Sequence, residues 1–519
     1  MGAFLSRDRI TAPPGFDRWL VPPCALAIHL CIGMAYGFSV FWLPLSHMLG
    51  SPACTSLGAA IASTGCDWRV SDLVWVYTLF FVVLGLSAAL FGGWVERVGP
   101  RRAGLVSAAC WCGGMALGAV GVFLHQLWLF WIGAGVIGGI GLGIGYITPV
   151  STLIKWFPDR RGLATGMAIM GFGGGAMVGS PAADRLMAAF AGTGPNSGQA
   201  GVWQAMLVLA GLYALFMTAG ALGFRLPAPG WAPPGKTEVI AGGRYVPLAR
   251  AWRTPQFWLV WCVLLLNVSA SIGIIGLASP MVQEIFGGAL FGTATRFADF
   301  SDADRAAAAA AGAGFVGLLS LFNIAGRFAW ASLSDRIGRK AMYAAILALG
   351  AACYGVALPA SPGLPLFVAV FALVASMYGG GFAAVPAWLA DLFGTRQVGA
   401  IHGRLLTAWS TAGVLGPLLV AYMRDTRLAA GVARETVYGP IFLMLAGLLA
   451  MGLVAALLVK PVRGDLWVDD DETPAARPVT AAATPANWGL RMAAWSVVLL
   501  PLGWGGWFTM QKAAVLLMQ

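Results

Sequence analysis

The stretch GGWVERVGPRR at residues 92–102 and the stretch ASLSDRIGRK at residues 331–340 share one pattern. Each begins with small residues and continues with an acid, an Arg, an apolar residue, a Gly and further basic residues. Gly99 and Gly338 permit a tight turn. One copy could be a simple turn on a positively charged side of the chain. Two copies at matching places indicate an internal repeat of the whole fold.

Long apolar stretches surround both copies, and each is long enough to cross a bilayer as a helix of about 20 residues. We predict twelve spans, at residues 20–45, 71–94, 103–124, 127–151, 162–187, 203–224, 256–283, 309–333, 341–360, 364–390, 398–422 and 438–459. Residues 492–511 could form a thirteenth span or an interfacial anchor. The two motif copies then follow spans two and eight, six spans apart.

Lys and Arg are distributed unevenly between the two sides of these spans. With the N-terminus inside, 23 of the 32 Lys and Arg residues lie on the inner side and 7 on the outer side. This bias is the positive-inside signal, and it predicts a cytoplasmic N-terminus.

Polar segments divide the chain into parts. We expect an N-terminal segment (1–19), a six-helix bundle (20–224), an inner linker (225–255), a second six-helix bundle (256–460), a tether (461–491) and the extra helix (492–519). The fold class is therefore an all-α membrane protein built from two related bundles with pseudo-two-fold symmetry. Parallel repeats of this kind are known among secondary transporters.

Composition supports this class, since 59% of the residues are hydrophobic and 10% are charged, against about 25% charged in soluble domains. A net charge of +11 would suggest a nucleic-acid partner in a soluble protein, but here it reflects membrane sidedness. The Gly-rich run 133–145 lies within a span and follows no strand, so it is not a nucleotide-binding loop. No metal site, cofactor motif or catalytic triad appears, which argues against an enzyme and against an ATP-driven pump.

The arrangement over residues 20–460 resembles the major facilitator superfamily, and more narrowly its oxalate:formate antiporter branch. The stretches that carry the narrower resemblance are AIHLCIGMAYGFSVF (27–41), GGIGLGIGY (138–146) continuing to KWFPDRRG (155–162), GFGGGA (171–176) and LLTAWS (405–410). The resemblance implies a substrate-binding Arg in span eight, a position that Arg327 matches. It also implies a Lys in span eleven, where this chain has Trp409.

Arg327 is the only basic residue well inside a span, and no Asp or Glu lies in mid-membrane. Because Arg keeps its charge, a buried Arg needs an anion, and its planar fork suits a carboxylate. We therefore expect a small organic anion as substrate, and one charge in place of two favours a monocarboxylate such as formate, lactate or pyruvate over oxalate. Alternatively, Arg327 could reach the inner side or bind backbone carbonyls.

Further candidates for the substrate cavity are polar or aromatic residues inside spans: Tyr36, Tyr146, Tyr378, Trp409, Asn267, Asn323 and His29. Each could instead serve helix packing. His29 could be a proton-linked switch, since the ordinary pKa of His is near 6.5, or a neutral His bonded to a neighbouring helix.

The motif copies also supply candidate gating residues, namely Glu96, Arg97, Arg101, Asp335, Arg336 and Arg339. The acid could pair with an Arg or sit at a neighbouring helix N-terminus, and so close the inner side. Cys54 and Cys66 share the first outer loop and could pair if that loop faces an oxidising compartment.

The sequence thus favours a secondary transporter of small organic anions that works by alternating access, as an exchanger or linked to protons. The alternative within the same fold is a multidrug or other organic-solute effluxer, although a buried acid for cationic drugs is missing. We expect a monomer in the bilayer of a bacterial plasma (inner) membrane.

Overall fold

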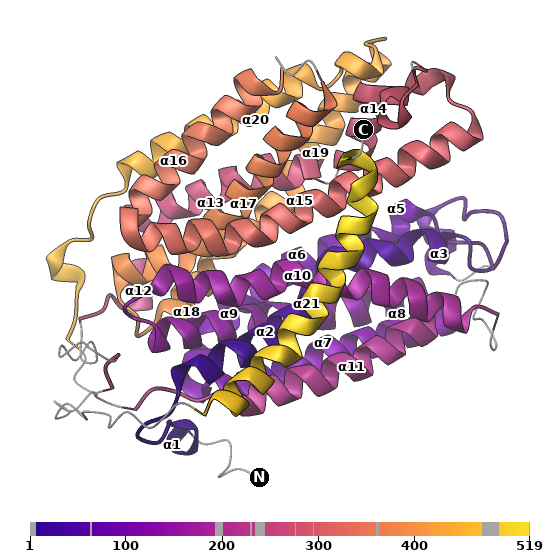
Figure 1. Ribbon diagram of the computed structural model, residues 1–519. Coiled ribbons are helices and arrows are strands. Elements are labelled where there is room, and N and C mark those ends of the chain that lie inside the picture. Colours follow the sequence, from indigo (N-terminus) through magenta and orange to yellow (C-terminus); the bar gives the residue numbers. More distant parts are fainter. Residues whose placement is uncertain are drawn as a thin grey trace.

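A computed structural model describes residues 7–62, 65–192, 201–228, 231–233, 244–275, 277–293, 295–359, 363–469 and 487–517. Part of the predicted linker (229–230 and 234–243) and most of the predicted tether (470–486) lie outside these described residues. The described chain is almost entirely helical, and it forms two groups of long helices that lie side by side (Figure 1).

The first group contains six membrane-length segments. They are α2 (Val21–Ile32) with η3 (Gly33–Phe41) and α3 (Trp42–Ser46); α5 (Val70–Leu73) with α6 (Trp75–Val98); α7 (Pro100–Phe123); α8 (Leu127–Phe130) with η4 (Trp131–Ile137) and α9 (Gly138–Trp156); α10 (Arg161–Phe190); and α11 (Val202–Gly223).

The second group repeats this plan. Its segments are α13 (Pro255–Ile275) with α14 (Ala278–Phe286); α15 (Asp302–Ile337); α16 (Arg339–Ala352) with η7 (Cys353–Ala357); α17 (Leu364–Phe393); α18 (Val398–Leu405) with α19 (Thr407–Ala429); and α20 (Gly439–Leu458). The short elements are α1 (Arg7–Ile10), η2 (Arg18–Leu20), α4 (Leu57–Ile61), α12 (Leu248–Ala251), η5 (Gly287–Phe291), η6 (Phe297–Asp299), η8 (Arg434–Thr436) and η9 (Gly464–Leu466).

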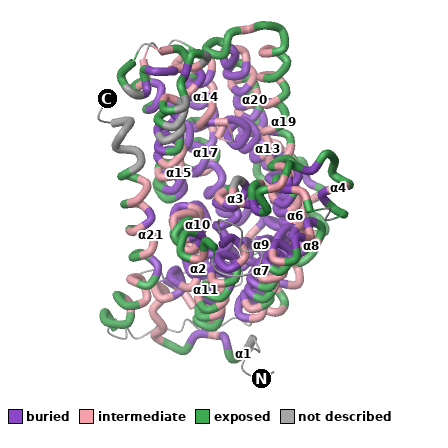
Figure 2. Tube along the Cα trace, turned by 90° about the vertical axis from the view of Figure 1, so that its right-hand side faces the viewer, coloured by how far each residue is buried: buried purple, intermediate pink, exposed green. Residues whose placement is uncertain are grey.

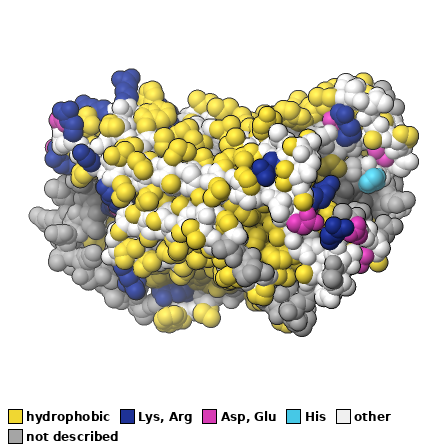
Figure 3. Space-filling view, turned by 90° about the horizontal axis from the view of Figure 1, so that it is seen from above, with side chains coloured by type: hydrophobic (Ala, Val, Ile, Leu, Met, Phe, Trp, Pro, Cys, Tyr) yellow, Lys and Arg dark blue, Asp and Glu magenta, His cyan; other side chains and the backbone are white. Residues whose placement is uncertain are grey.

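The surface of the described chain fits a bilayer. Twelve helical segments are long and apolar enough to cross a membrane. Large apolar side chains lie exposed on them, for example Leu90 (76%) on α6 and Leu418 (60%) on α19. Figure 3 shows an apolar band between two ends where charged side chains gather. The chain is therefore a multi-pass membrane protein.

Spans one and seven are among the places where the structure departs from the predicted regular spans. Predicted span seven is divided into α13 and α14, because Pro280 in the first turn of α14 has no amide hydrogen to continue the helical ladder. The middle of span one, η3, is wound as a 3₁₀ helix, which is tighter than an α-helix.

Small residues let the helices of the two groups approach closely where the groups meet. At Gly85 of α6, an added Cβ would lie 2.1 Å from Ser410 Oγ of α19, and at Gly403 of α18 it would lie 2.2 Å from the carbonyl oxygen of Ala88. On the other flank α10 packs against α15. Burial is densest where these helices meet in the middle of the molecule (Figure 2).

The extra C-terminal segment is a single helix, α21 (Trp488–Leu517), which lies obliquely across the flank formed by α10 and α15 (Figure 1). Its start is tied to the first group, since Arg491 pairs with Asp17 at 2.6 Å. Further along, the guanidinium of Arg185 on α10 lies 4.3 Å from the ring centroid of Phe508 on α21. Because α21 also packs on α15, it contacts both groups.

The loop between α3 and α5, which is predicted to face outward, is closed by a disulfide between Cys54 and Cys66 with a sequence separation of 12. We expect a thiol reagent added from outside to label neither residue before reduction and both afterwards, as read from the mass of the peptides that contain them. The double change Cys54→Ser/Cys66→Ser should lower the free energy of unfolding by about 3 kcal/mol, because the unfolded chain gains freedom. Labelling of Cys54 without reductant would contradict the pairing.

At the end of the second group that is predicted to face outward, Glu284 of α14 is buried (2% side-chain exposure) between two cations. Arg424 and Arg434 pair with it, and the Tyr438 hydroxyl donates to it at 2.6 Å. Burial alone would raise the pKa of Glu284, but hydrogen bonds from Arg424 and Tyr438 outweigh it and lower the pKa below its ordinary value. The cluster thus ties α14 to the outer ends of α19 and α20.

We expect Glu284→Gln to lower stability by about 3 kcal/mol at pH 7, since it leaves Arg424 without its carboxylate. The folded-state pKa is depressed, so the stabilisation is present above the ordinary pKa of about 4.5 and is lost as pH falls through the folded value. Thermal unfolding of both proteins from pH 7 to pH 3 should show the difference shrinking in acid. A difference independent of pH would contradict this reading.

Candidate functional site

Arg327 lies on α15 at the centre of the molecule, with no exposed surface. Its Nε donates to Asn323 Oδ1 at 3.0 Å, one turn earlier on the same helix. Its Nη1 donates to the carbonyl oxygen of Ile169 on α10 at 3.1 Å, in the first group. None of the ion pairs of the described residues includes Arg327. The guanidinium is therefore held across the two groups by neutral acceptors alone.

Glycines make room for this side chain. An added Cβ at Gly379 of α17 would lie 3.1 Å from Arg327 Cγ, and one at Gly173 of α10 would lie 3.1 Å from its Nε. Gly residues of α10 and α17 therefore border Arg327 on two sides.

Aromatic rings from both groups surround the guanidinium. Its central carbon lies 5.9 Å from the ring centroid of Phe172 on α10 and 5.4 Å from that of Phe382 on α17. Trp409 of α19 packs its ring 4.7 Å from Phe382 and 5.3 Å from Tyr146 of α9. Such a dry, aromatic surrounding strengthens the electrostatic attraction between Arg327 and an anion.

Several buried donors in this cluster have no hydrogen-bond partner among the described residues. They are Arg327 Nη2, the Tyr146 hydroxyl and Trp409 Nε1. Buried polar groups are nearly always paired, so an unpaired set that includes a charged group calls for an explanation. A ligand rich in acceptors, such as a carboxylate, would satisfy all three kinds of donor.

The other predicted cavity residues lie in the same central layer, and they differ in how directly they contact Arg327. Asn323 holds Arg327 and donates to the Ala375 carbonyl at 3.1 Å. Tyr36 and Tyr378 approach each other across the two groups, with 3.3 Å between their hydroxyl oxygens. Asn267 of α13 is buried beside Gly381 of α17, where an added Cβ would lie 2.7 Å from its Nδ2.

His29 of α2 sits between two backbone carbonyls. Its Nδ1 lies 2.5 Å from the Ala168 oxygen, and its Nε2 lies 3.1 Å from the Tyr146 oxygen. A neutral imidazole donates from only one nitrogen, whereas an imidazolium donates from both. Ala168 immediately precedes Ile169, the partner of Arg327, so His29 and Arg327 contact adjacent peptide units of α10.

Sequence reasoning missed His402 on α18. The side chain is buried, its Nδ1 has no partner among the described residues, and its ring lies 5.9 Å from Tyr146. His402 lies next to Arg404 in a stretch that reads as the basic inner end of span eleven, so its position near the centre was not apparent. Phe172 and Phe382 were missed because aromatic residues are common in apolar spans.

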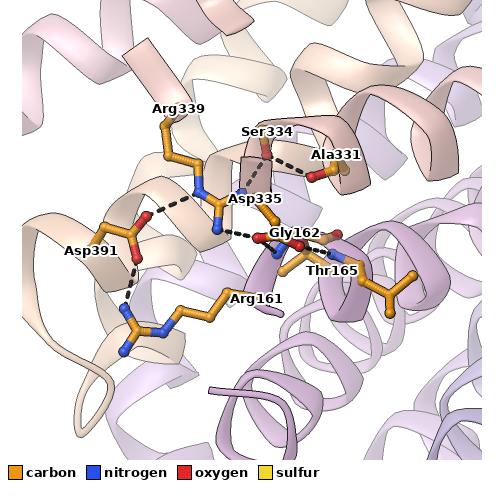
Figure 4. Close-up of polar contacts among 9 residues, drawn as sticks. Arg161, Gly162, Thr165, Ala331, Ser334, Asp335, Arg339 and Asp391 are labelled. Atoms are coloured by element: carbon orange, nitrogen blue, oxygen red, sulfur yellow. Dashed lines mark hydrogen bonds and ion pairs between the residues drawn. The ribbon is translucent and has the colours of Figure 1, made fainter. Parts of the chain in front are cut away.

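At the end of the molecule that is predicted to face inward, motif residues join the two groups (Figure 4). Asp335, at the end of α15, accepts hydrogen bonds from the backbone amides of Gly162 and Leu163 at the start of α10, both at 2.8 Å. Arg339 donates to Asp335 at 2.6 Å and to Asp391 at 2.9 Å, and Asp391 also pairs with Arg161 at 2.6 Å. We name these five residues around Asp335 and Asp391 the inner latch: Arg161, Gly162, Asp335, Arg339 and Asp391.

The first motif copy repeats the arrangement. Glu96, at the end of α6, accepts from the amide of Gly399 at the start of α18 at 3.0 Å and pairs with Lys155 at 2.5 Å. Each acid therefore sits at the positive N-terminal end of a helix from the opposite group. Of the remaining candidates, Arg101 donates to the Phe224 carbonyl in the first group, while Arg97 and Arg336 lie exposed.

Several known proteins have sequences similar to this one. The chain is 26% identical over 398 residues to the uncharacterised MFS-type transporter YhjX of Escherichia coli, covering 74% of this chain and 83% of that protein. It is 27% identical over 407 residues to the apicoplast pyruvate carrier 1 of Toxoplasma gondii (66% and 68% covered). It is 24% identical over 403 residues to the oxalate:formate antiporter of Oxalobacter formigenes (77% and 83% covered).

The fold is shared with solved structures. The Escherichia coli fucose:proton symporter FucP aligns with a TM-score of 0.57 at 13% identity, over 86% of this chain and all of that one. The family model of the Major Facilitator Superfamily matches residues 25–301 and 302–518. This family consists of transporters rather than enzymes. The chain therefore belongs to the major facilitator superfamily, and within it resembles the oxalate:formate antiporter family.

Proposed function

We propose that this protein carries small monocarboxylate anions across the membrane by alternating access. The observation that carries the proposal is Arg327, which is fully buried, has an unpaired Nη2 and makes no ion pair within the described chain. A carboxylate bound there would receive two parallel charge-assisted hydrogen bonds from one guanidinium. Tyr146 and Trp409 would donate to the remaining acceptor sites.

Two features favour a monocarboxylate over a dicarboxylate. The cluster provides one permanent positive charge, because Trp409 stands where the oxalate:formate antiporter family has a Lys. The walls are apolar rings, namely Phe172, Phe382 and Trp409, which suit a small uncharged substituent such as a methyl group. A relative named as a pyruvate carrier agrees with a monocarboxylate, and one named as an oxalate:formate antiporter agrees with small organic anions in general.

Alternating access follows from the contacts between the two groups. Asp335 and Glu96 close the inner end by capping helices of the opposite group, and such caps can form and break as a unit. We infer that the six motif residues act here. Asp335, Glu96 and Arg339 act directly, and Arg97 and Arg336 shape the positive inner surface. Arg101 is buried and holds the Phe224 carbonyl within the first group. Because these contacts join two separate sets of helices, we also propose that the chain forms two bundles, at residues 20–224 and 256–460.

Counterflow in proteoliposomes tests the proposal most directly. Vesicles loaded with unlabelled formate, lactate, pyruvate or oxalate would be diluted into the labelled acid. We expect fast exchange of at least one monocarboxylate and slower exchange of oxalate. Exchange of none of them, with transport of cationic dyes instead, would replace this proposal with drug efflux.

A proton link is the second part of the proposal, and His29 supports it because two carbonyl oxygens face its two nitrogens. We expect an inward pH gradient to drive lactate accumulation in the native protein. In His29→Gln this accumulation should be lost, because an amide side chain does not take up and release a proton near neutral pH. Counterflow at equal pH should persist. Accumulation by His29→Gln at the native level would show that His29 does not carry the proton. A native protein that accumulates no lactate would leave exchange as the mode of transport.

The positive-inside bias supports a cytoplasmic N-terminus, and the Cys54–Cys66 disulfide suits an oxidising space at the other end. We therefore propose a monomer in a bacterial inner membrane, with the inner latch facing the cytoplasm.

A further inference from the structure

A cavity of about 350 Å³ opens at the inner ends of α16, α17 and α20, away from the central site. Its charged lining residues are Arg339, Lys340, Lys460 and Asp391. Trp388 and Trp467 complete its walls together with apolar residues of the segment that follows α20. Arg339 and Asp391 also belong to the inner latch, whereas the other lining residues have no role in the transport cycle described above.

The cavity carries excess positive charge. Asp391 already pairs with Arg161 and Arg339, and Arg339 also pairs with Asp335. Lys340 donates to the carbonyl oxygen of Val459 at 3.0 Å, a contact that orients the ammonium group without neutralising it. Lys460 is exposed beside it. Two ammonium groups on this wall thus form no ion pair with a carboxylate of the described chain.

A backbone feature adds to this charge. The first two residues of the fourteen-residue helix α16, Arg339 and Lys340, line the cavity. The positive N-terminal end of α16 therefore lies at the cavity wall. The site therefore combines a concave shape, two free ammonium groups and a helix N-terminus. An oxyanion with several acceptor oxygens, such as a phosphate group, is the ligand that these donors fit.

The surroundings distinguish a lipid from a free phosphate. Just before the cavity, α20 exposes apolar side chains toward the bilayer, among them Val454 (57%), Leu457 (52%) and Leu458 (55%). Trp388 is buried and stacks on Tyr343, with 4.6 Å between ring centroids. Trp467 is half-buried at the other side of the opening. Trp residues at the end of a span mark the boundary between the lipid chains and the headgroups.

We propose that this cavity binds the phosphodiester headgroup of an anionic phospholipid of the inner leaflet, with the acyl chains lying along the exposed side chains of α20. The proposal rests on the orientation proposed above and not on the identity of the cargo. Lys340 and Lys460 hold the phosphate, and the N-terminus of α16 donates to it. Bound there, the lipid lies directly beside Arg339 of the inner latch.

The test is lipid retention by the purified full-length protein. Protein in detergent would be supplied with phosphatidylglycerol or phosphatidylcholine, and the bound lipid would be counted by native mass spectrometry. We expect retention of phosphatidylglycerol by the native protein, and a fall of about tenfold or more in Lys340→Gln/Lys460→Gln. The matched control is Arg244→Gln/Arg463→Gln, two exposed cations at the same end that pair with Asp469 and Asp465.

Three outcomes would overturn the proposal. Equal loss in the control pair would mean that retention reflects overall charge. Equal retention of phosphatidylcholine would mean that the site does not select lipids with a net negative charge. Displacement of the lipid by inorganic phosphate at millimolar concentration would assign the site to a soluble phosphate. Because neither Lys belongs to the central site, monocarboxylate counterflow in neutral vesicles should be unchanged, so a failure here leaves the transport proposal standing.

Discussion

Arg327→Lys is expected to reduce monocarboxylate transport by about a hundredfold or more while leaving the protein folded. Lys keeps the positive charge but loses the planar fork, so two parallel hydrogen bonds to the carboxylate become one. It also leaves Asn323 Oδ1 and the Ile169 carbonyl competing for a single ammonium group. Each lost hydrogen bond to a charged group is worth about 1.5–3 kcal/mol, which gives the expected factor.

The experiment compares Arg327→Lys and Arg327→Gln with the native protein in the counterflow assay. Arg250→Lys, a change at an exposed Arg outside the central site and the inner latch, serves as the control and should transport normally. Size-exclusion profiles and thermal unfolding report whether each variant folds. Native-level transport by Arg327→Gln would remove the central role of this residue, and the anion assignment with it.

Asp335→Asn is expected to have the second largest effect, by opening the inner latch. The carboxylate accepts from two backbone amides and from Arg339, and an amide side chain can offer only one acceptor oxygen. Losing acceptors for buried donors costs about 1–3 kcal/mol each, so the closed inner end should lose about 3 kcal/mol. A loss of that size shifts the balance between open and closed states roughly a hundredfold.

Access to the inner end can be measured with Thr165→Cys on α10, a fully buried position one turn after Gly162. In inside-out vesicles, a membrane-impermeant thiol reagent should label this Cys much faster when Asp335→Asn is also present. Asp465→Asn, an exposed acid at the same end, is the control. Unchanged labelling would show that Asp335 does not keep the inner end closed, whatever its effect on the rate of transport.

The repeated motif and the unpaired Arg327 were both accessible from sequence, for different reasons. A repeat is visible in the spacing of residue types along the chain, so it can be recognised without a structure. A charge within a long apolar run is conspicuous because burying it costs so much free energy that it needs a function or a partner. The partner itself, the Ile169 carbonyl, belongs to a helix of the other group, about 160 residues away, and no local pattern encodes such a contact.

Other features of the site depended on the third dimension. His402 reads as part of a basic inner segment, and only the packing of α18 against α9 brings it beside Tyr146. The division of predicted span seven at Pro280 was underestimated because membrane helices often tolerate Pro. The disulfide was left open by the sequence because pairing depends on the compartment as well as on distance.

The oblique course of α21 makes the two flanks of the molecule unlike each other. The internal repeat alone would give two equivalent seams to the surrounding lipid, one between α10 and α15 and one between α6 and α19. α21 covers the first, while the second faces the acyl chains with residues such as Leu90 and Leu418. A neighbouring membrane protein, or a hydrophobic molecule diffusing in the bilayer, can therefore reach the contact between the two groups on one flank only, the flank of α6 and α19.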